Sequence, residues 1–203
     1  LHNATIQKAL RMMNSKQLGA FDVNQAPART REAFGDTPFG RRCLAAIQLI
    51  STGVRCVEVT LQGWDTHVNN HESHTRQNAI LDPAFAALIR ELRARKMLDE
   101  TIVICAGEFG RTPKINAASG RDHWPTGFSL ALAGGGFKGG HVHGATDPTG
   151  ISKEPQNPIR IADIHSTVLS ALGIEFEKEM MTPIGRPMAL SKGNVIKSLL
   201  KTV

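Results

Sequence analysis

Apolar residues recur at helical spacing along several stretches of the chain, and segments that contain glycine and proline separate these stretches. Apolar positions three or four residues apart are typical of a helix that buries one face. We therefore predict helices over about residues 4–17 and 38–52, in a region that ends near residue 98, and over about residues 160–172. Pro83 fits a first helical turn better than a helix interior, so we expect the long helix to begin or kink there.

Three further segments have the pattern of β-strands. Apolar and polar residues alternate over residues 54–61, which is typical of a strand with one buried face. Residues 101–106 form a short continuous apolar run, which is typical of a strand buried on both faces. Residues 128–133 form a third apolar segment and are followed by three glycines. The order helix, strand, helix, strand, strand, helix favours a layered α/β fold with a largely parallel sheet.

Polar side chains with the chemistry of metal ligands follow the first two predicted strands. Asp65 and His67 come just after residues 54–61, and Glu108 comes just after residues 101–106. Ligands of open α/β sheets bind beyond the carboxyl ends of the strands, so two parallel strands would bring these groups to the same edge. Carboxylate oxygens and imidazole nitrogens together suit zinc, manganese or iron. The placement therefore favours a divalent metal site.

A second pair of the same residue types, Asp122 and His123, lies in a loop before the third predicted strand. That strand must run antiparallel, or the loop must fold over the site, if these residues are to join the first pair. A lone aspartate is usually a turn former, and a lone histidine is usually a surface or core residue. Two such pairs with a glutamate after a strand, all bounded by glycines, favour the metal interpretation.

Histidines and arginines near these pairs have both functional and structural interpretations. His71 and His74 follow the first pair at helical spacing, and we expect them at a solvated helix start. Arg111 and Arg121 could hold a phosphate or sulfate through two parallel hydrogen bonds. Their structural alternative is to neutralise the neighbouring carboxylates. The sequence leaves both roles open.

Composition narrows the classes of partner. The chain has 203 residues, a formal net charge of +6 and an isoelectric point of about 9.6, which suits an anionic partner. Its basic residues are scattered and no aromatic residues interleave with them, which argues against a nucleic-acid groove. No apolar stretch approaches the roughly 20 residues that a membrane span needs. Three cysteines without a close pair indicate buried thiols rather than a disulfide framework. We expect a single domain over residues 1–203.

Several of these segments together resemble one protein family. The sequences GWDTH, GEFGRTP, GRDHWP, LAGGGFKGG, HGATD and GRP look like the C-terminal half of the domain-of-unknown-function 1501 family. Its members are bacterial exported proteins related to the alkaline phosphatase and sulfatase superfamily. The resemblance implies a three-layer α/β/α sandwich, a mostly parallel sheet, bound metal and a periplasmic or extracellular location. It also implies that an N-terminal strand and the nucleophile region precede this chain.

The resemblance also implies roles for individual residues. Asp65, His67 and His123 match the superfamily positions that hold one metal ion. Glu108 matches the acidic ligand of a second ion, but Phe109 stands where a histidine ligand is expected. Because of this departure, the resemblance does not establish a site for the second ion.

These observations predict a metal-dependent hydrolase of phosphate or sulfate esters. The predicted ligands of a divalent ion are Asp65, His67, Glu108, Asp122 and His123. Zinc is the favoured ion, with manganese, iron or calcium as alternatives. Arg111 and Arg121 are the groups expected to orient an anionic ester, either a small molecule or a polysaccharide. The alternative is a non-catalytic relative that binds an anionic extracellular ligand such as a sulfated polysaccharide, and Phe109 motivates it.

Overall fold

A computed structural model of the protein describes residues 2–13, 15–150 and 154–201. The chain forms two compact units, Leu1–Ala94 and Arg95–Val203. No helix among the described residues combines the length and the apolar character that crossing a membrane requires. The part of the protein described here therefore contains no helical membrane span.

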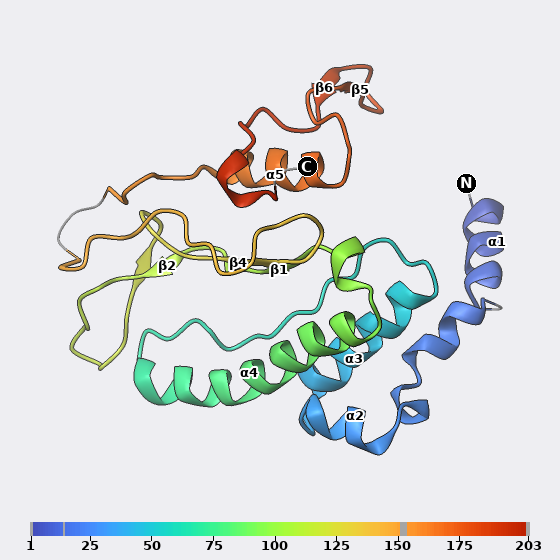
Figure 1. The fold of residues 1–203 in the computed structure, drawn as a ribbon, viewed down its shortest axis with the longest axis horizontal. Helices are drawn as coiled ribbons and strands as arrows, with labels where there is room; N and C mark the ends of the chain where they lie inside the picture. The colour runs from blue at the N-terminus through green and yellow to red at the C-terminus, as the bar shows by residue number, and fades with distance from the viewer. Residues whose placement is uncertain (1, 14, 151–153, 202–203) are drawn as a thin grey trace. The chain divides into compact units, whose positions relative to one another are not determined.

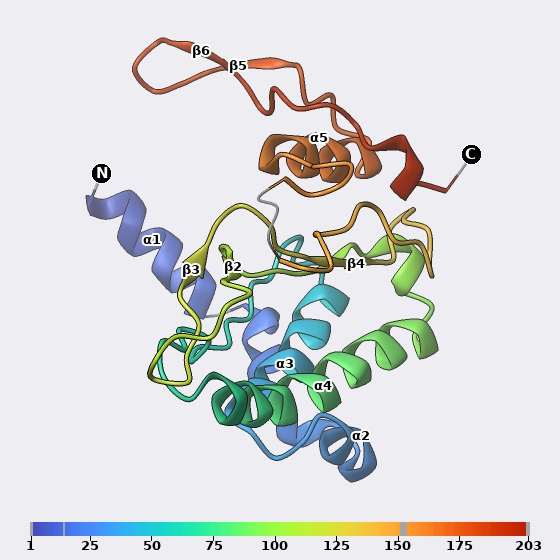
Figure 2. The same cartoon turned by 90° about the vertical axis from the view of Figure 1, so that its left-hand side faces the viewer.

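The first unit is helical. Its elements are α1 (His2–Met13), η1 (Lys16–Phe21), η2 (Val23–Gln25), α2 (Ala28–Ala33), α3 (Pro38–Ser51) and α4 (Asn70–Ala94). Helices α3 and α4 pack side by side, as both views of the ribbon show (Figures 1 and 2). The fully buried side chains of this unit are aliphatic or aromatic and include Phe34, Leu44, Ile47 and Leu92. This apolar core is consistent with the helical spacing of the sequence.

Local capping explains the bounds of α3. The Thr37 hydroxyl oxygen accepts a hydrogen bond from the Gly40 N–H at 3.0 Å, and Pro38 occupies the start of the helix. Gly53 follows the helix with a φ of 91°, a left-handed conformation that glycine adopts without strain. The predicted helix over residues 38–52 is therefore confirmed.

The long helix differs from its prediction at one point. Helix α4 begins at Asn70 and continues through Pro83, so it does not begin at that proline. Pro83 is exposed, which lets its ring sit on the solvent side of the helix. The tertiary packing of Ala84, Ala87 and Leu92, all buried, outweighs the loss of one backbone hydrogen bond at the proline.

The second unit contains short strands and one longer helix. Its elements are η3 (Leu98–Glu100), β1 (Val103–Cys105), β2 (Gly110–Arg111), β3 (His123–Trp124), β4 (Ala131–Ala133), α5 (Ile161–Ala171), β5 (Glu179–Met181), β6 (Pro187–Ala189) and η4 (Lys197–Leu199). Strand β1 pairs with β4, β2 with β3, and β5 with β6, each pair antiparallel. The unit therefore has three separate two-stranded sheets among its described residues.

The predicted three-layer sandwich with a mostly parallel sheet is wrong. Every sheet in the described part of the chain has two antiparallel strands, and residues 54–61 form no strand. The alternation in that segment survives only as burial, since Val57, Val59 and Leu61 are half-buried whereas their neighbours are exposed. Alternation specifies which face is buried, but a strand also needs a partner in register. The chain thus keeps a mixture of helix and strand without the expected sheet.

Strand β1 and helix α5 lie where they were predicted. Ile104 in the middle of β1 is 48% exposed, so this strand is not buried on both faces.

At the start of α5, the Asp163 carboxylate accepts hydrogen bonds from the Arg160 side chain at 2.9 Å and from the Asn194 N–H at 2.8 Å. These bonds hold the pKa of Asp163 well below its usual range, and the bond from the Arg160 side chain has the largest effect. Asp163 therefore joins the start of the helix to the C-terminal segment.

Candidate metal centre

The first predicted Asp/His pair is formed within the first unit. Asp65 Oδ1 and His67 Nε2 lie 3.1 Å apart, and both side chains are exposed. Two ligands of one tetrahedral zinc ion, each about 2.1 Å from it, are separated by roughly 3.4 Å, which is close to the observed spacing. The spacing also suits a hydrogen bond from the imidazole to the carboxylate. The chemistry and the spacing of this pair therefore fit a divalent ion.

Thr66 anchors the loop between the two members of the pair. It is only 4% exposed, although both neighbours point to solvent. The Asn70 side-chain amide donates to the Thr66 hydroxyl oxygen at 2.6 Å, and the same oxygen lies 3.2 Å from His74 Nε2. Because Asn70 donates, the hydroxyl hydrogen is available to His74. The first turns of α4 thus fix the backbone that carries Asp65 and His67.

A ring contact supports the same anchor. The Trp64 and His74 rings meet edge to face, with centroids 5.3 Å apart. Both histidines lie at the start of α4 as predicted, but His71 is exposed whereas His74 is half-buried rather than fully solvated. A sequence signal for this anchor existed, because Asn70 and His74 are four residues apart and share one helix face. What the sequence lacked was any indication that this face meets Thr66.

The second predicted pair lies on the β2–β3 hairpin of the second unit. His123 is exposed and stands opposite Arg111 in the register of the two strands. The Phe109 ring lies against the His123 imidazole, with centroids 4.2 Å apart. The Arg111 guanidinium lies 5.7 Å from the centre of the same Phe109 ring. Phe109 therefore occupies the immediate surroundings of His123.

Asp122 and Arg121 hold the loop of this hairpin. Asn116 donates its side-chain amide to Asp122 Oδ1 at 3.2 Å, and the Asp122 N–H donates to the Thr112 hydroxyl at 3.1 Å. Arg121 Nη1 donates to the carbonyl oxygens of Thr112 and Pro113, each at 2.6 Å. These contacts give both residues a structural role, and that of Arg121 is to hold backbone carbonyl oxygens, which differs from the carboxylate neutralisation expected as its structural alternative.

Arg111 and Glu108 complete the predicted set. Arg111 Nη1 donates to the Arg121 carbonyl oxygen at 3.4 Å, and the Arg111 side chain is half-buried. Glu108 is exposed and directly precedes Phe109. The structure therefore gathers Asp65 with His67 in one unit, and Phe109, Arg111, Arg121, Asp122 and His123 on one hairpin of the other. The metal-binding and anion-orienting roles of these residues stay predictions.

Comparison with known proteins identifies the family. A family model described as "Protein of unknown function (DUF1501)" matches residues 1–200. The chain belongs to the DUF1501 family. No curated protein and no solved structure matches it. Membership in the predicted family is therefore confirmed over almost the whole chain, and it carries no assigned activity.

The DUF1501 match places the motif residues in a family context. The segments around Asp65, Glu108 and His123 all lie within the matched range. The match by itself assigns no role to any of these side chains.

Proposed function

We propose that this DUF1501 protein is a metal-dependent hydrolase of phosphate or sulfate esters. The observation that carries the proposal is the Asp65–His67 pair, whose donor atoms lie 3.1 Å apart on a loop anchored through buried Thr66. A fixed backbone keeps two exposed donors at a spacing suited to one ion. The resemblance to the alkaline phosphatase and sulfatase superfamily, which we keep as part of the proposal, supplies the reaction class.

Three side chains hold the ion in this proposal. Asp65 and His67 supply a carboxylate oxygen and an imidazole nitrogen, and His123 supplies a second imidazole because of its place in the GRDHWP motif. This mixed oxygen and nitrogen set suits zinc, with manganese or iron as alternatives. A bound divalent cation polarises an ester oxygen and stabilises the negative charge that develops on it. Glu108 and Asp122 are proposed as further acidic ligands.

Arg111 is the stronger of the two proposed anion-orienting residues. Its guanidinium stands beside the Phe109 ring on the same hairpin as His123. Arg121 already donates to two carbonyl oxygens within its loop, so its contribution to an anionic ester is smaller. A planar guanidinium can donate two parallel hydrogen bonds to a phosphate or sulfate group. The substrate in this proposal is a small-molecule or polysaccharide ester. Its location in the periplasm or the extracellular space is the part of the proposal that rests on the family resemblance alone.

Metal content and turnover together test the proposal. The full chain is incubated with zinc or manganese, freed of excess ion, and analysed for bound metal and for hydrolysis of 4-nitrophenyl phosphate and 4-nitrophenyl sulfate. We expect His67→Ala and His123→Ala to lose most of both signals. His71→Ala is the matched control, because His71 is an exposed imidazole four residues along the chain. Unchanged metal and unchanged hydrolysis in His67→Ala and His123→Ala would refute the proposal.

Phe109 favours a second candidate function, a non-catalytic protein that binds an anionic extracellular ligand. Phe109 stands at the sequence position where the resemblance leads us to expect a histidine ligand of the second ion, and its ring lies against the His123 ring at a centroid distance of 4.2 Å. A site with an incomplete ligand set can retain anion binding through Arg111 without turnover. Saturable binding of heparin, with no hydrolysis of either nitrophenyl ester, would favour this second function.

A further inference from the structure

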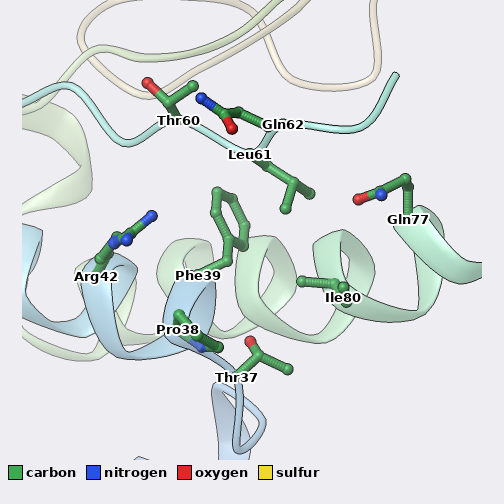
Figure 3. A pocket seen from close by; sticks show the side chains of 9 residues that line it. All are labelled: Thr37, Pro38, Phe39, Arg42, Thr60, Leu61, Gln62, Gln77 and Ile80. Carbon is green, nitrogen blue, oxygen red and sulfur yellow. The ribbon is translucent and has the colours of Figure 1, made fainter. Parts of the chain in front are cut away.

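A pocket of about 410 Å³ lies within the first unit, between α3, α4 and the extended residues 60–62 (Figure 3). Its volume is within the range of about 300–1,000 Å³ that is common for small-molecule sites. The lining combines apolar side chains, hydroxyls, amides and one guanidinium. None of the residues proposed above as metal ligands lines it.

The apolar wall comes from three different segments. Phe39 projects from α3, Ile80 from α4 and Leu61 from the extended segment, and Figure 3 shows the three side chains facing one another. Phe39 is 8% exposed, so its ring is fixed by the surrounding structure. This arrangement favours a ligand with a compact apolar body.

The charge of the pocket lining is positive. Among the described residues that line the pocket, Arg42 carries a charge and there is no aspartate or glutamate. Figure 3 shows its guanidinium directed toward Thr60 at one end of the pocket. The adjacent Arg41 instead pairs with Asp36 at 2.7 Å and does not line the pocket. The lining therefore favours an anionic group next to Arg42.

Gln77 adds a specific hydrogen-bonding requirement. Its side-chain oxygen Oε1 is buried and has no hydrogen-bond partner among the described residues. Figure 3 shows this oxygen on the side of the pocket that faces Leu61. A buried acceptor without a donor destabilises the folded protein, and a ligand N–H or O–H would remove that penalty. Gln77 thus selects for a ligand that donates.

The neighbouring backbone keeps Gln77 in this position. Gly63 has a φ of 99°, and a Cβ built at this residue would collide with the Gln77 amide. A glycine therefore lets the extended segment pass close to the amide of α4. The orphan acceptor is held by a close approach of backbone and side chain rather than by a loose surface rotamer.

We propose that this pocket is a binding site for a small organic anion with an apolar body and one N–H or O–H donor. The anionic group pairs with Arg42, the donor bonds to Gln77 Oε1, and the apolar body packs against Phe39, Leu61 and Ile80. The proposal stands whether or not a metal ion binds at Asp65 and His67. The family description assigns no function, so this ligand site goes beyond what that description says.

Methyl NMR of the full chain tests the site with three probes of this class: indole-3-acetate, N-acetylphenylalanine and 4-hydroxyphenylacetate. We expect saturable shifts of the Leu61 and Ile80 methyl signals with at least one of them. The methyl signals of Ile47, which is fully buried in α3 and outside the pocket, should not move. The absence of a saturable shift with all three probes would overturn the proposal.

Matched ligands and variants separate the two recognition elements. Tryptamine replaces the anion of indole-3-acetate with a cation, and 1-methylindole-3-acetate removes its N–H donor. Arg42→Gln should lower the affinity by about tenfold or more for whichever anionic probe binds to the native protein. Arg41→Gln should leave that affinity unchanged. Equal binding of the indole anion and tryptamine, or equal effects of the two arginine variants, would contradict the charge assignment.

The amide has its own matched control, because Gln48 Oε1 is also buried without a partner but lies outside the pocket. We expect Gln77→Leu to abolish the preference for a donor-bearing ligand over its methylated analogue. Gln48→Leu should keep that preference. Both variants remove an unsatisfied polar atom, so both should raise the melting temperature. A preference retained in Gln77→Leu would overturn the role of Gln77.

Discussion

The Thr66 hydroxyl oxygen lies 3.2 Å from His74 Nε2 and ties the Asp65–His67 loop to the first turns of α4. Asn70 donates to the same oxygen at 2.6 Å, so one buried hydroxyl satisfies two side chains of the helix. The donor pair at the surface therefore depends on an interaction beneath it. A substitution at Thr66 can therefore change the position of the loop without changing its exposed donor side chains.

Removal of this hydroxyl should loosen the loop. We expect Thr66→Val, which keeps the shape of the side chain, to lower the free energy of unfolding by about 1–3 kcal/mol, because Asn70 and His74 lose a buried partner. Bound zinc should fall in the same variant. Urea denaturation and metal analysis measure the two effects. Thr75→Val is the control, since its exposed hydroxyl donates to the His71 carbonyl oxygen within the same helix, and a similar loss there would contradict the anchor.

Phe109 offers a gain-of-function test of the proposed metal chemistry. Its ring lies 4.2 Å from the His123 ring, so Phe109→His would bring two imidazoles close enough to share an ion. We expect zinc affinity, measured by competition with a chelator, to rise about tenfold. Phe109→Leu controls for loss of the aromatic ring. An unchanged affinity in Phe109→His would indicate that His123 is not a ligand.

Asp163 should make stability depend on acid. Hydrogen bonds from Arg160 and Asn194 hold its pKa below the value of about 3.9 expected in the unfolded chain. A lowered folded-state pKa contributes stability above the unfolded pKa, and this contribution is lost as the pH falls through the folded pKa. The stability difference between the native protein and Asp163→Asn should therefore be largest above about pH 5 and shrink below about pH 4.

Denaturation midpoints at pH 7, 5, 4 and 3 measure this difference. Asp99→Asn is the control, because Asp99 is a largely exposed carboxylate that pairs with Lys201 at the surface. Such surface pairs contribute little, so its difference should stay small at every pH. A constant difference for Asp163→Asn across the same range would contradict the assigned cause.

Pro83 should limit the stability of the first unit. It is exposed inside α4 and lacks the N–H that a helix interior requires. We expect Pro83→Ala to raise the free energy of unfolding by about 1–3 kcal/mol, measured by urea denaturation. Asp82→Ala is the adjacent exposed control and should change it by less than about 0.5 kcal/mol. Destabilisation by Pro83→Ala would show that contacts of the ring outweigh the helix defect.

The cysteines should differ in their rate of alkylation. Cys56 is exposed, Cys105 is half-buried and Cys43 is 4% exposed. Burial raises the pKa of the Cys105 thiol, which lowers the fraction of reactive thiolate. We expect iodoacetamide to modify Cys56 first, then Cys105 and last Cys43, as followed by mass spectrometry. Modification of Cys105 before Cys56 would contradict this order. The prediction of three buried thiols is already wrong for exposed Cys56.

The sequence by itself determined features that depend on a few adjacent residues. The Thr37–Pro38 start and Gly53 end of α3 could be predicted because capping acts within one turn of the helix. The family motifs and the donor types around Asp65, Glu108 and His123 are likewise sequence properties. Even the alternating burial of residues 54–61 was visible in the pattern.

Only the tertiary structure decided which distant groups meet. The same residues 54–61 form no strand, because pairing needs a partner in register and alternation does not specify one. Burial of Thr66 under Asn70 and His74, and of the Gln77 oxygen beside the pocket, follows from how α4 packs against the extended segment. Such contacts join residues from different elements, so no local pattern encodes them. The donor residues could be predicted from the sequence, whereas the contacts that anchor them and the neighbouring pocket could not.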